Sequence, residues 1–403
     1  MDYINTPMNK IGRVVTGKTP STAVPEYYDG EIMFITPTEL HTDFVVERSE
    51  KTITQAGFDS IKTNTIRGTS VMVGCIGWDM GNVALCTETC ATNQQINSIT
   101  AIKSAYNPLY LYYWLKTKKD YLFSIASVTR TPILSKSTFE EILVPMPKKD
   151  KQDAVARVLS TVDKKIMLNN RINDNLEQQA KLLYDYWFTQ FDFPDENGNP
   201  YRASGGQMEW NDVLNRHIPV GWKAKSLAEL MKKNTTAFDY TSTQPVIDLS
   251  VMPSGSIALS QLNTSDNFTT NLYQMKKGDI LFGSIRPYLH KAGFAPCDGV
   301  VAGTVHSYSV KNENDYNFAL ITVSRNAFFD YAVNVSSGTK MPVVSSDSIL
   351  AYKVPYNNEI VSRFNDIALM ETIASNVQEN QKLIELRDWL LPMLMNGQAS
   401  VED

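Results

Sequence analysis

The chain contains an internal duplication, and this feature limits the possible folds more than any other. Residues 129–135 (TRTPILS) recur as residues 339–345 (TKMPVVS), at an offset of 210 positions. The run VMVGCI at 71–76 recurs as ILFGSI at 280–285, at an offset of 209. Matching runs in the same order indicate a duplicated structural unit. We therefore expect two similar domains rather than one large domain.

Each copy ends in a long segment with helical periodicity. Apolar side chains recur at spacings of three and four from about Lys151 to Trp187 and again from about Glu359 to Met395, with asparagine or glutamine near each middle. This pattern predicts two helices that pair along a heptad seam, whose polar layer fixes the register. The alternative is two separate amphipathic helices, each lying on its own domain. The expected seam residues are Val155, Leu159, Val162, Ile166, Asn169, Asn173, Leu176, Leu183, Ile367, Met370, Val377, Asn380, Ile384 and Leu391.

The remainder of each copy has strand and turn patterns. The runs VMVGCIGW, DILFGSI and GVVAGTVHSYSV are β-branched and bounded by glycine, which predicts strands. Asn107 and Pro108 are expected to cap and open a helix over LYLYYWLK. The turn-rich residues 191–207 are expected to form a surface connection. The expected fold class is therefore α+β, with two tandem mixed domains.

The composition excludes several classes of protein. The chain has 403 residues, of which 43% are hydrophobic, so it can bury large cores. Its four cysteines provide no disulfide framework for a chain of this length, which favours a reducing compartment. The first residues, MDYINTPMNK, contain no apolar signal region, and no run of about 18 apolar residues occurs. We expect a cytoplasmic protein.

Motifs that suggest catalysis lack the context that catalysis needs. Residues 12–19 (GRVVTGKT) match the Walker A pattern, but a polar run precedes them and Pro20 and Pro25 follow, where a phosphate-binding loop needs a strand and then a helix. Residues 107–110 (NPLY) resemble the N/D-P-P-Y/F motif of amino methyltransferases, with leucine in place of the second proline and no glycine-rich turn upstream. The histidines are scattered, and the Cys86–Cys90 pair has no second pair to complete a zinc site. No catalytic or metal-binding residue is predicted.

Positive charge is concentrated once in each copy, although the whole chain has a net charge of −5. Residues 101–136 carry a local charge of +5 and residues 276–291 a local charge of +3, with aromatic side chains between the cations. Such stretches are typical of surfaces that bind phosphates and base edges. The alternative is a solvated surface cluster, but the recurrence in both copies favours a binding role.

The chain resembles the specificity (S) subunits of type I restriction–modification systems along nearly its whole length. Single motifs are weak evidence, whereas their order and duplication are specific. The segments that carry the resemblance are TGKTPS (16–21), ATNQQINSI as a strand (91–99), the Thr-Arg-Thr-Pro to Val-Pro-Met-Pro block (129–147), the helix IMLNNRINDNLEQQAKLLYDYWF (166–188), IPVGW (218–222) and LRDWLLPMLMNGQ (386–398).

The resemblance implies a division of labour. Each mixed domain would be a target-recognition domain for one half of a split, asymmetric DNA sequence. The two helices would form an antiparallel, coiled-coil-like spacer, giving an internal pseudo-twofold repeat. Two modification subunits using S-adenosylmethionine would dock on the chain, and restriction subunits using ATP and Mg²⁺ would complete the complex, while the chain itself would have no active site and no cofactor. The implied division is recognition domain 1 at 1–148, a central helix at 149–190, a connection and recognition domain 2 at 191–357, and a C-terminal helix at 358–403.

The second copy departs from the first where the first has TGKTPS, because KKNTTAF (232–238) is only a loose counterpart. ATNQQINSI likewise corresponds to the different run VAGTVHSYS at 301–309. Such divergence is expected if the two domains recognise different bases. It also means that DNA-contacting residues cannot be transferred from one copy to the other.

Candidates for DNA contact are the basic and amide residues on turns that flank strands, because such groups bind phosphates and base edges. In the first copy they are Lys18, Asn93, Gln94, Gln95, Arg130 and Lys136. In the second copy they are Lys276, Lys277, Arg286, His290, Lys291 and Lys340. Two other functions are consistent with the sequence: an enzyme that uses residues 12–19 or 107–110, and a protein-binding scaffold around the helical pair with no role on DNA.

Overall fold

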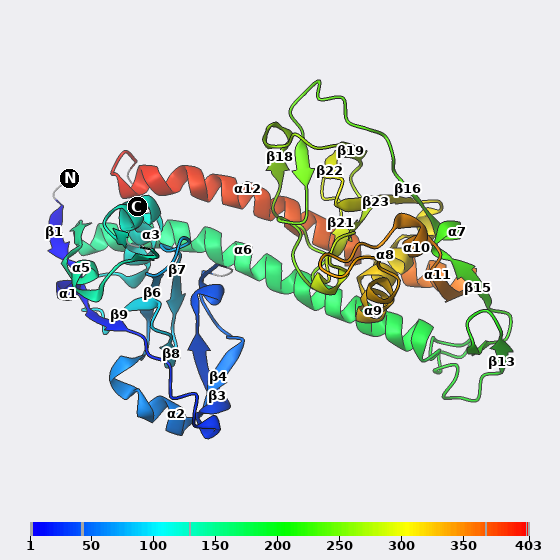
Figure 1. Cartoon of the computed structure of the whole chain (residues 1–403), viewed down its shortest axis with the longest axis horizontal. Coiled ribbons are helices and arrows are strands. Elements are labelled where there is room, and N and C mark those ends of the chain that lie inside the picture. Colours follow the sequence, from blue (N-terminus) through cyan, green and yellow to red (C-terminus); the bar gives the residue numbers. More distant parts are fainter. Residues whose placement is uncertain (1–2, 42–43, 129, 367–368, 400, 402–403) are drawn as a thin grey trace. The chain divides into compact units, whose positions relative to one another are not determined.

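The computed structural model describes residues 3–41, 44–128, 130–366, 369–399 and 401 (Figure 1). The chain divides into two compact units, one formed by Met1–Met167 with Leu383–Asp403 and the other by Leu168–Lys382. Within the described residues, no helix is both long enough and apolar enough to cross a membrane.

The first unit contains two four-stranded sheets with the strand orders β2-β9-β6-β7 and β4-β3-β8-β5. Every pairing in them is antiparallel except that between β3 and β8. A further antiparallel pair joins β1 to β12. The bounds are β1 Ile4–Pro7, α1 Met8–Ile11, β2 Arg13–Thr16, β3 Tyr28–Ile35, β4 Lys51–Ile53, α2 Gln55–Ser60, β5 Thr65–Ile66, β6 Ser70–Gly74, β7 Val83–Cys86, β8 Cys90–Thr92, β9 Ile96–Thr100, α3 Pro108–Lys116, α4 Lys119–Ser124, β10 Ser127–Val128, β11 Pro132–Ile133, α5 Lys136–Glu141 and β12 Leu143–Met146.

The second unit repeats this topology, with the strand orders β16-β23-β20-β21 and β18-β17-β22-β19 and a single parallel pairing, between β17 and β22. The pair β15–β24 corresponds to β1–β12. The predicted duplication is confirmed. The bounds are β13 Met208–Asn211, β14 Arg216–Pro219, β15 Lys223–Ser226, α7 Leu227–Leu230, β16 Met231–Lys233, β17 Pro245–Ile247, β18 Asn263–Thr264, β19 Leu272–Met275, β20 Ile280–Gly283, β21 Ala292–Phe294, β22 Gly299–Ala302, β23 Val305–Val310, α8 Tyr316–Ser324, α9 Asn326–Asn334, α10 Ser346–Leu350, β24 Lys353–Tyr356 and α11 Asn358–Asn365.

Strand β6 lies between two cores, which explains its continuous apolar run. Val71 and Val73 pack in the core that contains α3, whereas Met72 faces the core of the second sheet, because successive side chains of a strand point to opposite faces. Helix α3 begins as predicted: Pro108 is its first residue, and the Asn107 Oδ1 accepts a hydrogen bond from the Leu109 N–H at 2.8 Å.

The run ATNQQINSI, predicted as a strand, forms two strands, β8 and β9, separated by a turn at residues 93–95. The sheet register also corrects the alignment of this run with the second copy. Ile99 lies opposite Val71, and Tyr308 lies opposite Ile280, so the offset here is 209 positions rather than 210. Only the hydrogen-bonded partners of a strand fix such a one-residue difference.

The connection at residues 191–207 differs from the expected surface segment. Phe191 and Phe193 are buried, and both rings contact Trp222 with centroids 5.5 Å and 5.2 Å away. The two phenylalanines make this part of the connection an extension of the core. Residues 196–199 and 202–205 of the connection are exposed.

Long helices follow the mixed part of each unit. Helix α6 spans Lys149–Tyr184, and α12 spans Leu369–Met395. The C-terminal segment, predicted as one helix from about Glu359, is divided, because α11 ends at Asn365 with Asp366 as its C-cap and α12 begins at Leu369.

In the second unit α6 and α12 pair antiparallel through asparagines. The Asn169 Nδ2 donates to the Asn380 Oδ1 at 2.9 Å, and the Asn376 Nδ2 donates to the Asn173 Oδ1 at 2.9 Å. Residue numbers rise along one helix as they fall along the other, so the helices run in opposite directions. The predicted pairing is confirmed, and the alternative of separate helices is wrong.

Burial separates the expected seam residues into two groups. Val155, Leu159, Asn169, Asn173, Val377, Asn380 and Leu391 are buried. Val162, Ile166, Leu176, Leu183 and Ile384 are half-buried. Ile367 and the side chain of Met370 lie outside the described residues. In the first unit the helices add a buried ion pair, Asp163–Arg387 at 3.0 Å, which the apolar pattern does not reveal.

Candidate nucleic-acid interface

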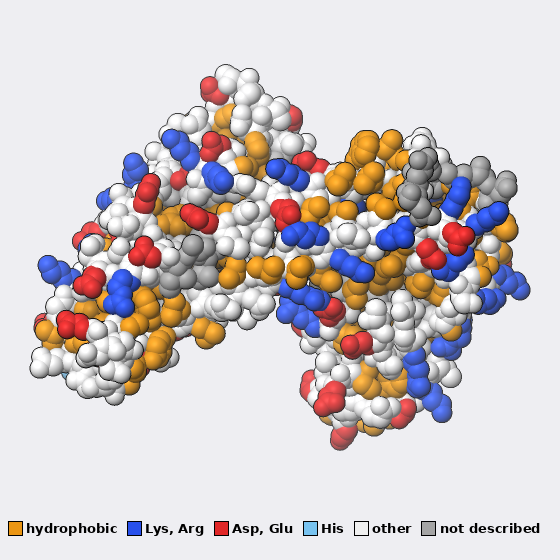
Figure 2. Space-filling view, turned by 180° about the vertical axis from the view of Figure 1, so that it is seen from behind, with side chains coloured by type: hydrophobic (Ala, Val, Ile, Leu, Met, Phe, Trp, Pro, Cys, Tyr) orange, Lys and Arg blue, Asp and Glu red, His pale blue; other side chains and the backbone are white. Residues whose placement is uncertain are grey.

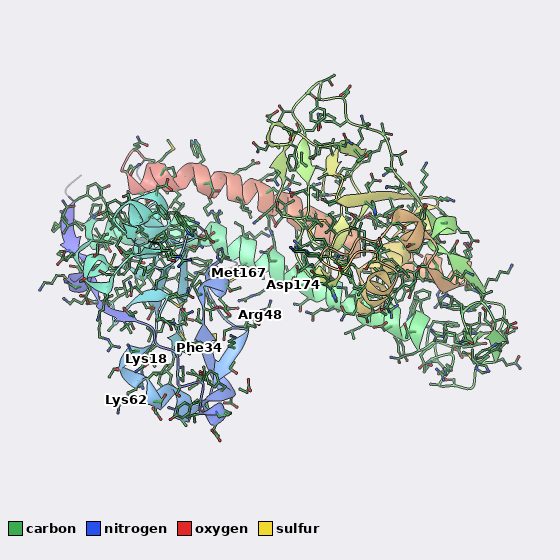
Figure 3. The ribbon with its side chains drawn as sticks, in the orientation of Figure 1. Lys18, Phe34, Arg48, Lys62, Met167 and Asp174 are labelled. Atoms are coloured by element: carbon green, nitrogen blue, oxygen red, sulfur yellow. The ribbon has the colours of Figure 1, made fainter. Side chains whose placement is uncertain are left out.

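Lys18 is exposed on the loop directly after β2, beside the turn at residues 93–95. The preceding residue must be glycine, because a Cβ at Gly17 would lie 2.2 Å from the Asn93 carbonyl oxygen. The Thr19 Oγ1 donates to the Gln94 Oε1 at 2.9 Å and ties the loop to the turn. Figure 3 shows Lys18 on the sheet-bearing part of this unit, away from Met167 on α6.

The turn itself is stabilised by two of the candidate amides. The Asn93 Nδ2 donates to the Gln95 Oε1 at 2.9 Å, and the Asn93 Oδ1 accepts from the Gln95 backbone N–H at 3.0 Å. Both side chains are half-buried, whereas Gln94 at the tip is exposed. Asn93 and Gln95 therefore shape the turn, and Gln94 is the amide that it presents to solvent.

Backbone hydrogen bonds join this turn to the segment that contains Arg130. The Cys75 N–H donates to the Gln95 carbonyl at 2.7 Å, the Gly77 N–H to the Pro132 carbonyl at 3.0 Å, and the Leu134 N–H to the Cys75 carbonyl at 2.9 Å. We call residues 75–77, 93–95 and 130–134 the first junction. Arg130 is exposed at its margin.

The second unit contains a junction with the same three bonds. The Ser284 N–H donates to the Thr304 carbonyl at 2.9 Å, the Arg286 N–H to the Pro342 carbonyl at 2.7 Å, and the Val344 N–H to the Ser284 carbonyl at 2.9 Å. We call residues 284–286, 302–304 and 340–344 the second junction. Its exposed cations are Arg286 and Lys340.

The other candidates are placed differently. His290 follows the second junction, and its ring stacks on Phe329 with centroids 4.5 Å apart. The Lys291 ammonium donates to the Leu249 carbonyl. Lys136, the first residue of α5, pairs with Glu140 at 3.6 Å. These three side chains contact their own unit and are weaker candidates for DNA contact than the exposed arginines.

The predicted patch at residues 276–291 is split between the two ends of β20. Lys276 and Lys277 are exposed in the turn before the strand, and Arg286 follows the strand. Four strand residues span about 13 Å at 3.3 Å per residue, so one small site cannot include both ends. Nearness along the chain therefore predicted a continuous patch where the extended backbone separates its members.

Some cations of the other patch, residues 101–136, have structural roles. The half-buried Lys116 lies 3.2 Å from the Tyr112 hydroxyl, and its burial, aided by Arg387, lowers the pKa of its ammonium. Lys119 pairs with Asp79 at 2.7 Å. In Figure 2 Lys and Arg side chains gather along one edge of the first unit, at the right of the view.

The catalytic interpretations find no support in the geometry. The loop after β2 leads to a single 3₁₀ turn at Pro25–Tyr27 instead of the α-helix that a phosphate-binding loop requires. Asn107 caps α3, and Tyr110 of the same motif is buried. Among the residues that the structure describes, no group of three or more His, Cys, Asp or Glu side chains could bind a metal.

The sequence comparisons find similarity to one group of proteins. The family model for the type I restriction modification DNA specificity domain matches residues 7–178. The type I restriction enzyme MjaIX specificity subunit of Methanocaldococcus jannaschii is 26% identical, over 98% of this chain and 92% of the relative. This chain contains a type I restriction modification DNA specificity domain and is similar along nearly its whole length to a type I specificity subunit.

Further relatives agree with this assignment. The EcoDI specificity subunit of Escherichia coli is 22% identical over 70% of each chain. A crystal structure of the type I restriction–modification S subunit from M. genitalium superposes with a TM-score of 0.54 at 14% identity, covering 98% of this chain and 96% of that one. The structural likeness supports the fold of two tandem domains with helices.

Beside each junction lies an exposed aromatic residue that is not among the predicted DNA contacts. Trp78 follows the first junction and is 70% exposed, and Tyr288 follows the second and is 51% exposed. Their position after the matching runs VMVGCI and ILFGSI is a signal for both, but the predicted contacts were basic residues and amides, with Tyr288 counted only among the aromatic side chains between the cations of residues 276–291.

Proposed function

We propose that this chain is the DNA-recognition subunit of a type I restriction–modification complex, and that each unit recognises one half of a bipartite target. The observation that carries the proposal is the pair of junctions. Each places an exposed arginine at one end of the same sheet topology, Arg130 in the first and Arg286 in the second. Cations on turns contact phosphates, and arginine and amide groups contact base edges in the major groove.

The helices α6 and α12 set the distance between the two half-sites in this proposal, and they provide docking surface for two modification subunits. The buried asparagines support a measuring role, because a polar layer in a helical seam fixes the register of the pair.

The chemistry belongs to partner subunits in this proposal. Modification subunits would bind S-adenosylmethionine and methylate adenine, and restriction subunits would use ATP and Mg²⁺ in the cytoplasm. The chain itself would contribute sequence recognition and bind no cofactor.

Mapping methylated adenines in host DNA, with and without the gene, tests this function. We expect one bipartite motif to lose methylation when the gene is removed and to regain it when the gene is restored. Unchanged methylation in a host that expresses the modification subunits would contradict the proposal. A complex that assembles normally and leaves no footprint on DNA would favour the protein scaffold.

A further inference from the structure

The loops that follow β6 and β20 have the same backbone design. Each loop closes on its own sheet: the Gly74 N–H donates to the Asn82 carbonyl at 3.0 Å, and the Gly283 N–H donates to the Lys291 carbonyl at 2.9 Å. We call residues 75–82 the first loop and 284–291 the second loop. Both have the same length, and each begins within its junction.

Both loops turn through left-handed backbone conformations at the same two positions. In the first loop these positions are Gly77 and Gly81, with φ of 103° and 91°. In the second loop they are Arg286 and His290, with φ of 53° and 52°. Glycine adopts such angles freely, whereas a residue with a Cβ is strained there. The second loop therefore retains two strained residues where the first shows that glycine suffices.

Strained residues of this kind concentrate at functional sites. The strain at His290 has a structural explanation, because its ring stacks on Phe329. Arg286 is exposed, and among the described residues its backbone N–H donates to Pro342 and its carbonyl accepts from Leu289, while its side chain forms no hydrogen bond. A role for the Arg286 side chain outside the unit explains why glycine is absent from this position.

Each loop also presents one large aromatic side chain to solvent, Trp78 in the first and Tyr288 in the second. The first loop is well supported, since Asp79 pairs with Lys119 at 2.7 Å and Trp78 lies 6.0 Å from the Phe123 ring. The second is supported by the stack of His290 on Phe329. Exposed aromatic rings on fixed loops, beside exposed cations, suit base contacts, because every base offers an apolar face and thymine a methyl group.

We propose that Trp78 and Tyr288 are base-contacting residues, each for the half-site recognised by its own unit, and that Arg286 is kept in a strained conformation to contact the same DNA. This inference rests on the proposed function and deepens it. DNA is the occupant that fits, since Arg130 and Lys340 flank the two loops and supply phosphate contacts.

The test uses the full chain assembled with its modification subunits and the duplex target identified by methylation mapping. Trp78→Ala should weaken target binding about tenfold, the usual order for losing one aromatic–base contact. The loss should vanish on a duplex whose first half-site is scrambled and persist when only the second is scrambled. Tyr288→Ala should show the reverse pattern. Trp78→Phe and Tyr288→Phe should retain most of the affinity.

The matched control is Trp210→Ala, because Trp210 is an aromatic residue that is 52% exposed on β13 and belongs to neither loop. It should bind as the unaltered complex does. If the unaltered complex shows no sequence-specific binding, the proposed function fails. If that complex is specific and Trp78→Ala and Tyr288→Ala match it, only this inference fails. Equal weakening on target and scrambled duplexes would show a non-specific contact and overturn the base-contacting role.

The strain has its own test. Arg286→Gly should raise the melting temperature while lowering target affinity, whereas Asn215→Gly should raise the melting temperature and leave affinity unchanged. Asn215 is the control because it also has a positive φ, of 50°, and lies in the turn between β13 and β14. Unchanged affinity in Arg286→Gly would show that the strain is not kept for DNA contact.

Discussion

The two units share a topology and differ in the side chains at their junctions. By sheet register, the turn Asn93–Gln94–Gln95 of the first unit corresponds to Ala302–Gly303–Thr304 of the second. At the two positions of positive φ, the first loop has Gly77 and Gly81, whereas the second loop has Arg286 and His290. The first junction therefore presents an exposed amide, Gln94, and one arginine, Arg130, whereas the second presents the two cations Arg286 and Lys340.

This contrast shows which constraints act on each part of the molecule. Strands β6 and β20, each of which leads into the junction of its own unit, are buried on both faces, as Met72 and Leu281 illustrate. Their side chains must therefore stay apolar and of suitable size. The junctions are held together through backbone groups, and Gln94, Arg130, Arg286 and Lys340 are exposed, which leaves the side chains at these positions free to differ. Two units of one fold can thus present two different surfaces to DNA.

Domain exchange should produce the largest effect. Replacing residues 1–148 with the corresponding segment of another family member should change one half of the methylated motif completely and leave the other half intact. The reason is that each unit has its own sheets and core. Methylation mapping measures the result, and a change in both halves would contradict independent recognition.

Lengthening the helical pair tests its measuring role. A heptad inserted in both α6 and α12, near Asn173 and Asn380, keeps the seam pattern and adds about 10 Å. The gap between half-sites should grow by about three base pairs, at 3.4 Å per pair. Insertion in α6 alone should mismatch the asparagines and destabilise the chain. A full-activity double insertion with an unchanged gap would refute the measuring role.

Arg387→Ala should destabilise the first unit by about 3–5 kcal/mol, because it leaves the Asp163 carboxylate buried without its cation. The Tyr113 hydroxyl, which donates to the same carboxylate at 2.7 Å, cannot replace the charge. Denaturant unfolding measures the loss. Lys149→Ala is the control on α6, since it breaks an exposed pair with Asp153 that is worth less than about 1 kcal/mol. Equal losses would contradict the dominant role of burial.

The second unit should be more sensitive to acid through His306, which occupies the position of Asn97 in the first unit. Burial, aided by the charge of Lys233, lowers the pKa of His306 to about 4. The unfolded state therefore binds a proton at His306 more readily than the folded state does. The free energy of unfolding is at its full value above pH 6.5, and it falls by up to about 3 kcal/mol as the pH drops towards 4. His306→Asn should reduce this acid loss in unfolding experiments, and an identical pH profile for the variant would contradict the assignment.

The smallest effects should come from single arginines. Arg130→Ala and Arg286→Ala each remove a cation at one junction. If the arginine contacts a base, we expect a loss of about 1–3 kcal/mol in binding and relaxed preference at one target position. If it contacts a phosphate, binding should weaken evenly and the salt dependence should flatten. Unchanged affinity in both variants of the assembled complex would remove these residues from the interface.

The pattern of apolar residues predicted the fold well, whereas the pattern of charged residues predicted the interface less well. The capped start of α3, the strands of the duplicated runs and the helical pairing all follow from local spacing. The basic patches did not stay whole in three dimensions: β20 separates Lys277 from Arg286, and Lys116 is half-buried against Tyr112. Charges near each other in sequence can lie at opposite ends of a strand, which linear counting does not detect.

The sequence alone determined the duplication, the fold class and the polar layer of the seam, because side-chain periodicity and turn residues act over a few positions. The tertiary structure decided the one-residue shift between the copies, the buried Asp163–Arg387 pair and the grouping of three distant segments into each junction. These features depend on hydrogen bonds and burial between residues far apart in the chain, whose partners local sequence does not specify. For the same reason, Trp78 and Tyr288 are identified as candidates for DNA contact by the tertiary structure, in which the two loops share one backbone conformation and each exposes its aromatic side chain.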